Sequence, residues 1–146
     1  MTLKKAPALA EKQRSNASIG IVFARFNSDI TTKMLESAHQ TAKEENLEIA
    51  VEQAVPGSLE IPFLAKRLLK KKNIQGVVCL GAIIAGSTKH DEIIGHAIAQ
   101  SLLDLSLQFD KPVGMGIIGP GATEAQAIER AEEYGRRAVL AVRQLI

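Results

Sequence analysis

The nine residues GVVCLGAII, numbers 76–84, decide the fold class of this chain of 146 residues. Apolar side chains follow one another without the alternation of a strand that has one face in water. An uninterrupted apolar run of this length predicts a strand buried on both faces, as in a parallel sheet. Helices must then cover both faces of that sheet. The broadest apolar helical stripe for this purpose is formed by Ile93, Ile94, Ala97, Ile98, Leu102 and Leu105.

The same run is one of four short β-rich segments, each followed by a longer segment with apolar residues three and four positions apart. Alternating strands and helices with right-handed crossovers predict a flavodoxin-like three-layer α/β/α sandwich around a central four-stranded parallel sheet. Gly135 is expected to divide the last helical segment in two. We expect strands at 18–24, 47–55, 76–84 and 113–118, and helices at 29–46, 58–72, 90–109 and 123–146.

The length of the chain suits one domain, which we expect at residues 18–146 after a flexible N-terminal arm at 1–17. The arm is polar, contains Pro7 and has no clear period. No continuous apolar stretch follows its lysines, so it does not resemble a secretory signal, and no apolar run approaches the roughly 18 residues of a membrane span. We therefore expect a cytoplasmic protein without a membrane partner.

Composition argues against a nucleic-acid partner and against a metal site. The formal net charge is only +2, and the one dense basic cluster, KRLLKKKN at 66–73, suits a solvated helix end. Cys79 is the single cysteine and lies within the buried run, where we expect a small core residue. No pair of cysteines or histidines has metal-ligand spacing.

Ligands of open parallel sheets bind outside the carboxyl ends of the strands. In the loop after residues 76–84, Gly86 precedes Ser87 and Thr88, whose amides and hydroxyls at a helix start suit a phosphate or another anion. Capping of the helix by Ser87 or Thr88 is the simpler alternative. His90 follows this loop, either as a proton shuttle or as a solvated surface residue. Neither a P-loop nor a G-x-G-x-x-G motif is present.

The other loops add candidates at the same sheet edge. Phe26, beside Asn27, comes just after the first strand and is either a stacking platform or a core ring. The Ser-Leu-Glu segment at 58–60 either caps a helix or holds a ligand. Arg130, about two turns into the last helix, is either a phosphate partner or a member of a surface salt bridge.

Four motifs in fixed order identify a family. RFN at 25–27, VPGSLEIP at 55–62, GAIIAGSTKHDEI at 81–93 and QAIERA at 126–131 together closely resemble the lumazine synthase family, with similarity over roughly residues 18–146. HDEI, with LQFDKPVGMGIIGPG, resembles the archaeal branch. The resemblance implies a transferase of riboflavin biosynthesis that condenses 5-amino-6-(D-ribitylamino)uracil with 3,4-dihydroxy-2-butanone 4-phosphate. Such an enzyme yields 6,7-dimethyl-8-ribityllumazine, phosphate and water, without a metal or organic cofactor.

The resemblance also implies a role for each candidate residue. His90 would be the proton donor and acceptor, and Phe26 would stack on the uracil ring. Arg130 would be the counter-charge of the phosphate. Contacts with the pyrimidine and ribityl groups are implied for Phe26, Asn27, Ser58, Leu59, Glu60, Ala82, Ile83, Ile84 and Met115, and contacts with phosphate for Gly86, Ser87, Thr88 and Arg130.

Members of this family form rings of five with the active site between neighbouring subunits, so we expect a pentamer at minimum. A further shell of sixty subunits stays open as an alternative. Met115 falls where many relatives place an aromatic residue of the next subunit, and Arg137 matches a basic position of that subunit only with a gap. Leu59 replaces a frequent phenylalanine, and Ala85 occupies a position that is often basic.

Two alternative functions stay open. One is an archaeal-type riboflavin synthase, a related fold that acts on the lumazine product. The other is a non-catalytic flavin- or lumazine-binding protein on the same scaffold. The GSTKH loop and the QAIER segment favour lumazine synthase over the first, and the presence of every expected chemical group argues against the second.

Overall fold

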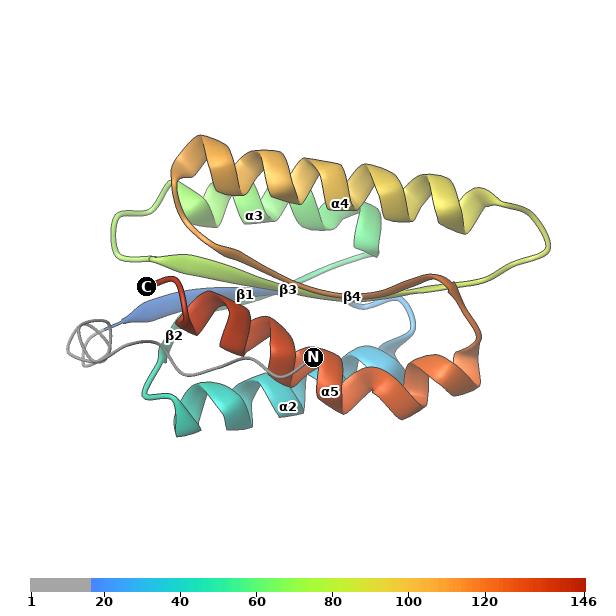
Figure 1. Ribbon diagram of the computed structural model, residues 1–146, viewed down its shortest axis with the longest axis horizontal. Coiled ribbons are helices and arrows are strands. Elements are labelled where there is room, and N and C mark those ends of the chain that lie inside the picture. Colours follow the sequence, from blue (N-terminus) through green and yellow to red (C-terminus); the bar gives the residue numbers. More distant parts are fainter. Residues whose placement is uncertain (1–16) are drawn as a thin grey trace.

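Two helical layers enclose a parallel sheet in the computed structural model, which describes residues 17–146 (Figure 1). Helices α3 and α4 cover one face of the sheet, and α2 and α5 cover the other. The predicted three-layer sandwich is confirmed. The strands, in the spatial order β2-β1-β3-β4, are β1 (Ser18–Ala24), β2 (Glu48–Val55), β3 (Gly76–Ile84) and β4 (Val113–Ala122). The helices are α2 (Ser28–Glu44), the short 3-10 helix η2 (Ser58–Glu60), α3 (Ile61–Leu69), α4 (His90–Phe109) and α5 (Glu124–Arg143).

Strand β3 lies between β1 and β4, and every residue of it except Ile84 is buried. Val78 and Leu80 belong to the core shared with α2 and α5, whereas Val77 and Cys79 belong to the core shared with α3 and α4. The uninterrupted apolar run thus serves two cores at once, as predicted. Burial raises the pKa of the Cys79 thiol to about 12, so this side chain is an unreactive core group.

Two details of the helices differ from the sequence-based prediction. Helix α5 continues unbroken through Gly135, because this glycine lets α5 approach α2: an added Cβ would lie 2.3 Å from the carbonyl oxygen of Met34. The predicted division at Gly135 is therefore wrong. On α4, Ile98 and Leu102 are buried, but Ile93 is 68% exposed, because the apolar stripe is broader than the contact with the sheet.

Backbone hydrogen bonds join the loops at the carboxyl edge of the sheet, to the right in Figure 1. The amides of Arg25 and Phe26 donate to the carbonyls of Val55 and Pro56, at 2.8 and 3.0 Å. On the other side of β3, the amide of Ala85 donates to the carbonyl of Ala122 at 2.8 Å. The loops that follow all four strands are therefore held together in two pairs at one edge.

Ala17 is buried, and its carbonyl accepts a hydrogen bond of 3.0 Å from the amide of Glu48. The rest of the expected N-terminal arm, residues 1–16, lies outside the described residues. Within residues 17–146, no helix is long and apolar enough to cross a membrane. The same residues contain no group of three or more His, Cys, Asp or Glu side chains that could hold a metal ion.

Candidate active site

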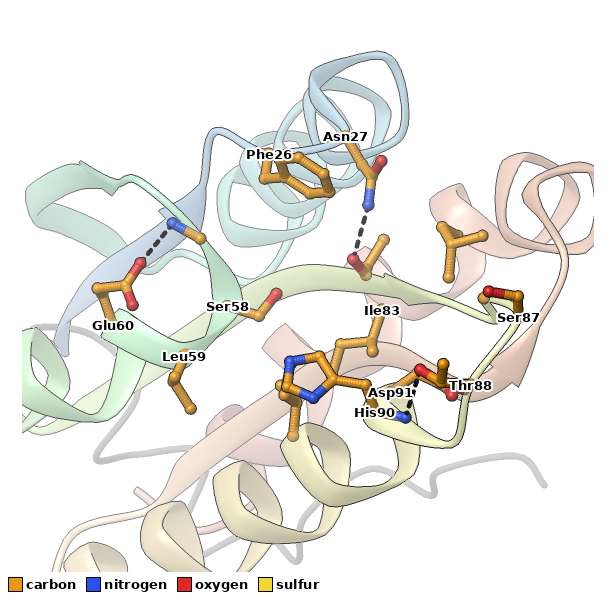
Figure 2. Close-up of a pocket in the computed structure, with 15 residues that line it drawn as sticks. Phe26, Asn27, Ser58, Leu59, Glu60, Ile83, Ser87, Thr88, His90 and Asp91 are labelled. Atoms are coloured by element: carbon orange, nitrogen blue, oxygen red, sulfur yellow. Dashed lines mark hydrogen bonds between the residues drawn. The ribbon is translucent and has the colours of Figure 1, made fainter.

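A cavity of about 450 Å³ opens at the carboxyl edge of the sheet, a size typical of sites for small molecules (Figure 2). The loop after β1, the η2 segment, the end of β3 and the start of α4 form its walls. All but three of the residues predicted from the sequence line it. The lining residues are Phe26, Asn27, Gly57, Ser58, Leu59, Glu60, Ala82, Ile83, Ile84, Gly86, Ser87, Thr88, His90, Asp91 and Ile94.

Phe26 presents its ring to this cavity from the loop between β1 and α2. Its side chain is 70% exposed, so the alternative of a core ring is excluded. The next residue, Asn27, adopts the left-handed backbone conformation with φ of 63°, a conformation in which asparagine is enriched. Its side-chain amide donates a hydrogen bond of 3.0 Å to the carbonyl of Ala82 (Figure 2). This bond fixes the loop that carries Phe26 against the end of β3.

The η2 segment combines the two roles that the sequence left open. A carboxylate oxygen of Glu60 accepts a hydrogen bond of 2.9 Å from the amide of Gly57, so Glu60 stabilises the turn into η2 while lining the cavity. Ser58 lies against β3, because Gly81 has no side chain there: an added Cβ would be 2.5 Å from the Ser58 hydroxyl oxygen. Glycine at position 81 therefore permits the close approach of this wall.

The loop Gly86–Thr88 leads into α4 and offers hydrogen-bond donors at the helix start. The N-cap of α4 is Lys89, whose side chain makes no capping bond. The Thr88 hydroxyl accepts a hydrogen bond of 3.4 Å from the amide of His90, which is near the outer limit for such a bond. The capping predicted for Ser87 or Thr88 is thus a single long contact by Thr88. Amides at the positive end of a helix suit an anion.

His90 is the first residue of α4 and its side chain is exposed. Figure 2 shows its imidazole extending over the cavity toward the η2 wall that carries Ser58 and Leu59. An imidazole in this position can exchange protons with a molecule held between the helix start and the opposite wall.

The charged side chains that line the cavity do not favour a phosphate by themselves. Its titratable side chains are Glu60, Asp91 and His90, and among the lining residues that the structure describes none is lysine or arginine. Two carboxylates near a phosphate ester disfavour its binding. A phosphate bound in this cavity would therefore need a cation from outside it to balance the charge.

Three predicted site residues do not line this cavity. Met115 lies on the edge strand β4 and is 41% exposed. Arg130 is exposed on α5, which packs on the other face of the sheet from α4. Arg137 is half-buried, with its guanidinium 6.0 Å from the centre of the Tyr134 ring.

Three lining residues were not predicted from the sequence as site residues. Gly57 and Ile94 contribute backbone and apolar surface, and the sequence predicts Ile94 only as part of the stripe that faces the sheet. Asp91 accepts a hydrogen bond of 3.0 Å from the amide of Gly121. Its sequence signals are its place in the GAIIAGSTKHDEI motif and its position beside His90 in the first turn of a helix, where an acidic residue is common for dipole reasons.

Residues 16–146 match the family model described as 6,7-dimethyl-8-ribityllumazine synthase. Proteins of that name from Staphylothermus marinus and Metallosphaera sedula are each 54% identical to this chain, over 130 and 127 residues. The first alignment covers 89% of this chain and 87% of the relative, and the second covers 87% and 84%. One from Saccharolobus islandicus is 50% identical over 134 residues, covering 92% and 87%.

Proposed function

Because the chain belongs to the 6,7-dimethyl-8-ribityllumazine synthase family, we propose that the cavity at the carboxyl edge of its sheet is the family's active site. The enzyme is a transferase of riboflavin biosynthesis, which condenses 5-amino-6-(D-ribitylamino)uracil with 3,4-dihydroxy-2-butanone 4-phosphate. The observation that carries the site proposal is the cavity itself. It gathers an exposed aromatic ring, a helix start whose amides suit an anion, and a histidine on one concave surface.

The pyrimidine substrate occupies the part of the cavity between Phe26 and the end of β3. Phe26 stacks on the uracil ring, and the backbone groups of Ala82, Ile83 and Ile84 meet its polar edge. The η2 wall, Ser58 to Glu60, meets the ribityl chain. Asn27 supports this arrangement, because its amide already donates to Ala82 and orients the loop of Phe26.

The butanone phosphate occupies the other end, with its phosphate on Gly86, Ser87 and Thr88 at the start of α4. The amine of the pyrimidine attacks the ketone and one water leaves to form an imine, phosphate is then eliminated, and the ring closes with loss of a second water. Every step transfers protons, and His90 lies beside the place from which phosphate departs. Most of the acceleration comes from holding two reactants in register, with proton transfer by His90 added to it.

Enzymes of this family are oligomers. We propose a pentamer as the smallest active assembly, in which Arg130, Arg137 and Met115 of one subunit complete the cavity of the next. The absence of lysine and arginine from the described lining supports this, as does the position of Arg130 away from its own cavity. Exposed apolar side chains on α4, such as Leu103 and Leu107, supply surface for subunit contacts. Light scattering distinguishes a pentamer from a shell of sixty.

Two further parts of the proposal concern the chain as a whole. Residues 18–146 form the single lumazine synthase domain, since the strands, helices and cavity all fall within this range. The enzyme works in the cytoplasm with small molecules as its substrates, and it uses neither a metal nor an organic cofactor.

Replacing Phe26 by alanine should raise the KM for the pyrimidine roughly 5- to 150-fold, because stacking of a base on an aromatic ring contributes about 1–3 kcal/mol. The KM for the butanone phosphate should change much less. Phe63→Ala is the matched control, since Phe63 is also exposed, at 66%, but does not line the cavity. Equal effects of the two substitutions on the pyrimidine KM would argue against stacking by Phe26.

The function is tested by incubating the protein with both substrates and following lumazine by absorbance and phosphate by a coupled assay. Formation of one lumazine per phosphate released, without conversion to riboflavin, supports the proposal. Lumazine supplied alone and turned into riboflavin would instead indicate a riboflavin synthase. Tight binding of lumazine without turnover of the two substrates would indicate a binding protein.

A further inference from the structure

Asp91 lines the cavity next to the helix start and has no role in the division of residues proposed above. It is half-buried, and its carboxylate oxygen Oδ2 accepts a hydrogen bond of 3.0 Å from the backbone amide of Gly121. Gly121 lies near the end of β4, so this bond joins the first turn of α4 to a different segment of the carboxyl edge.

The end of β4 also contacts the chain on both sides of the loop 86–89. Before the loop, the amide of Ala85 donates to the carbonyl of Ala122 at 2.8 Å. After it, α4 packs so closely on Pro120 that a Cβ added to Gly95 would lie 2.6 Å from the Pro120 Cδ atom. The tether from Asp91 to Gly121 lies between these contacts. The segment Gly119–Ala122 therefore holds both ends of the loop that carries the phosphate-binding residues.

Few other contacts hold this loop. Residues 85–90 are exposed, and Lys89 makes no side-chain cap at the start of α4. The hydrogen bond from the His90 amide to Thr88 is long, at 3.4 Å. A charge-assisted hydrogen bond such as that of Asp91 is stronger than such a neutral contact. Asp91 thus supplies the main side-chain constraint on the first turn of α4 among the residues described.

We propose that Asp91 is a positioning residue for the condensation: by binding the Gly121 amide, its carboxylate fixes the phosphate-binding loop and His90 in register with the rest of the cavity. This inference rests on the proposed function of that cavity. Asp91 does not itself transfer a proton or bind the phosphate. It acts through the first turn of α4, where a displacement of about 1 Å is enough to change rates by up to roughly a hundredfold.

The test compares Asp91→Ala, Asp91→Asn and Glu92→Ala in the oligomeric enzyme. Asp91→Ala removes the tether and should lower kcat/KM for the butanone phosphate about 10- to 100-fold. It should also raise the inhibition constant of inorganic phosphate about tenfold, while the KM for the pyrimidine stays within about twofold. The side-chain oxygen of an asparagine can still accept from the Gly121 amide, so Asp91→Asn should retain activity within about fivefold of the parent.

Glu92→Ala is the matched control, because it removes the same charge from the same helical turn at an exposed position outside the cavity. It should leave all the constants within about twofold. Three results would overturn the inference: Asp91→Ala behaving like Glu92→Ala, both substrate KM values rising equally, or Asp91→Asn losing as much as Asp91→Ala. The last of these would show that the charge, and not the tether, is required.

Hydrogen–deuterium exchange separates failure of this inference from failure of the proposed function. Whether or not the parent enzyme turns over, the amide of Gly121, which donates to Asp91, should exchange faster in Asp91→Ala than in Glu92→Ala. Unchanged exchange would contradict the tether. A parent enzyme that makes no lumazine, but shows the expected difference in exchange, would contradict the proposed function alone.

Discussion

Replacing His90 by alanine should lower kcat by about two to four orders of magnitude, because a positioned proton donor and acceptor contributes about that much. The KM values of both substrates should change far less, since the cavity keeps its walls. The side chain is exposed at the first residue of α4, so the fold should be retained. Steady-state kinetics at saturating concentrations of both substrates measure the loss directly.

The matched control for this variant is His96→Ala. His96 lies on the same helix and is also exposed, but it does not line the cavity. Its replacement should leave kcat unchanged. Full turnover by His90→Ala would remove the proton-transfer role from His90 and leave it to bound water or substrate groups.

Replacing Arg130 by alanine should raise the KM for the butanone phosphate about 10- to 100-fold, which corresponds to loss of one charged hydrogen bond to the phosphate. The KM for the pyrimidine should change little, because that substrate carries no phosphate. Inorganic phosphate should inhibit the variant more weakly than the parent. Initial rates measured against each substrate in turn separate these effects.

Arg136→Ala controls for the loss of positive charge from α5. Arg136 donates hydrogen bonds of 3.2 and 2.6 Å to Glu133 on the same helix, and these bonds lower the pKa of that carboxyl. Both side chains are exposed, and such pairs add little to stability. If Arg130→Ala and Arg136→Ala raise the KM for the butanone phosphate equally, the cause is a general electrostatic effect and not a contact with Arg130.

The fold could be predicted from the sequence because the patterns that indicate its strands and helices are local. The uninterrupted apolar run of β3 predicted a strand between two helical layers, and the period of the segments between the strands predicted the helices of those layers. The wrong division of α5 at Gly135 has a nonlocal cause. A glycine in a helix looks like a break until the neighbouring helix is known, and here α2 approaches close enough to require it.

The lining of the cavity was predictable where its residues follow the ends of strands. Phe26 comes just after β1, and His90 begins the helix that follows β3, so a parallel sheet brings both residues to one edge. Asp91 was not predictable in this way, since its partner is a backbone amide at Gly121, thirty positions away. For Arg130, the sequence predicted a role but not a location. Its position in a motif marked it as a site residue, but a single sequence does not say whose cavity it serves.

A subunit-mixing experiment with His90→Ala and Arg130→Ala chains tests most directly whether neighbouring subunits share the active site. The two are co-expressed with different tags, oligomers that carry both tags are isolated, and lumazine formation is measured at a low concentration of the butanone phosphate. If His90 and Arg130 of one site come from different subunits of a ring, about a quarter of the sites in random mixtures are intact, and about that fraction of the parent activity should return. If one subunit supplies both residues, no intact site forms. Activity that stays at the level of the separate variants would therefore contradict a site shared between neighbouring subunits.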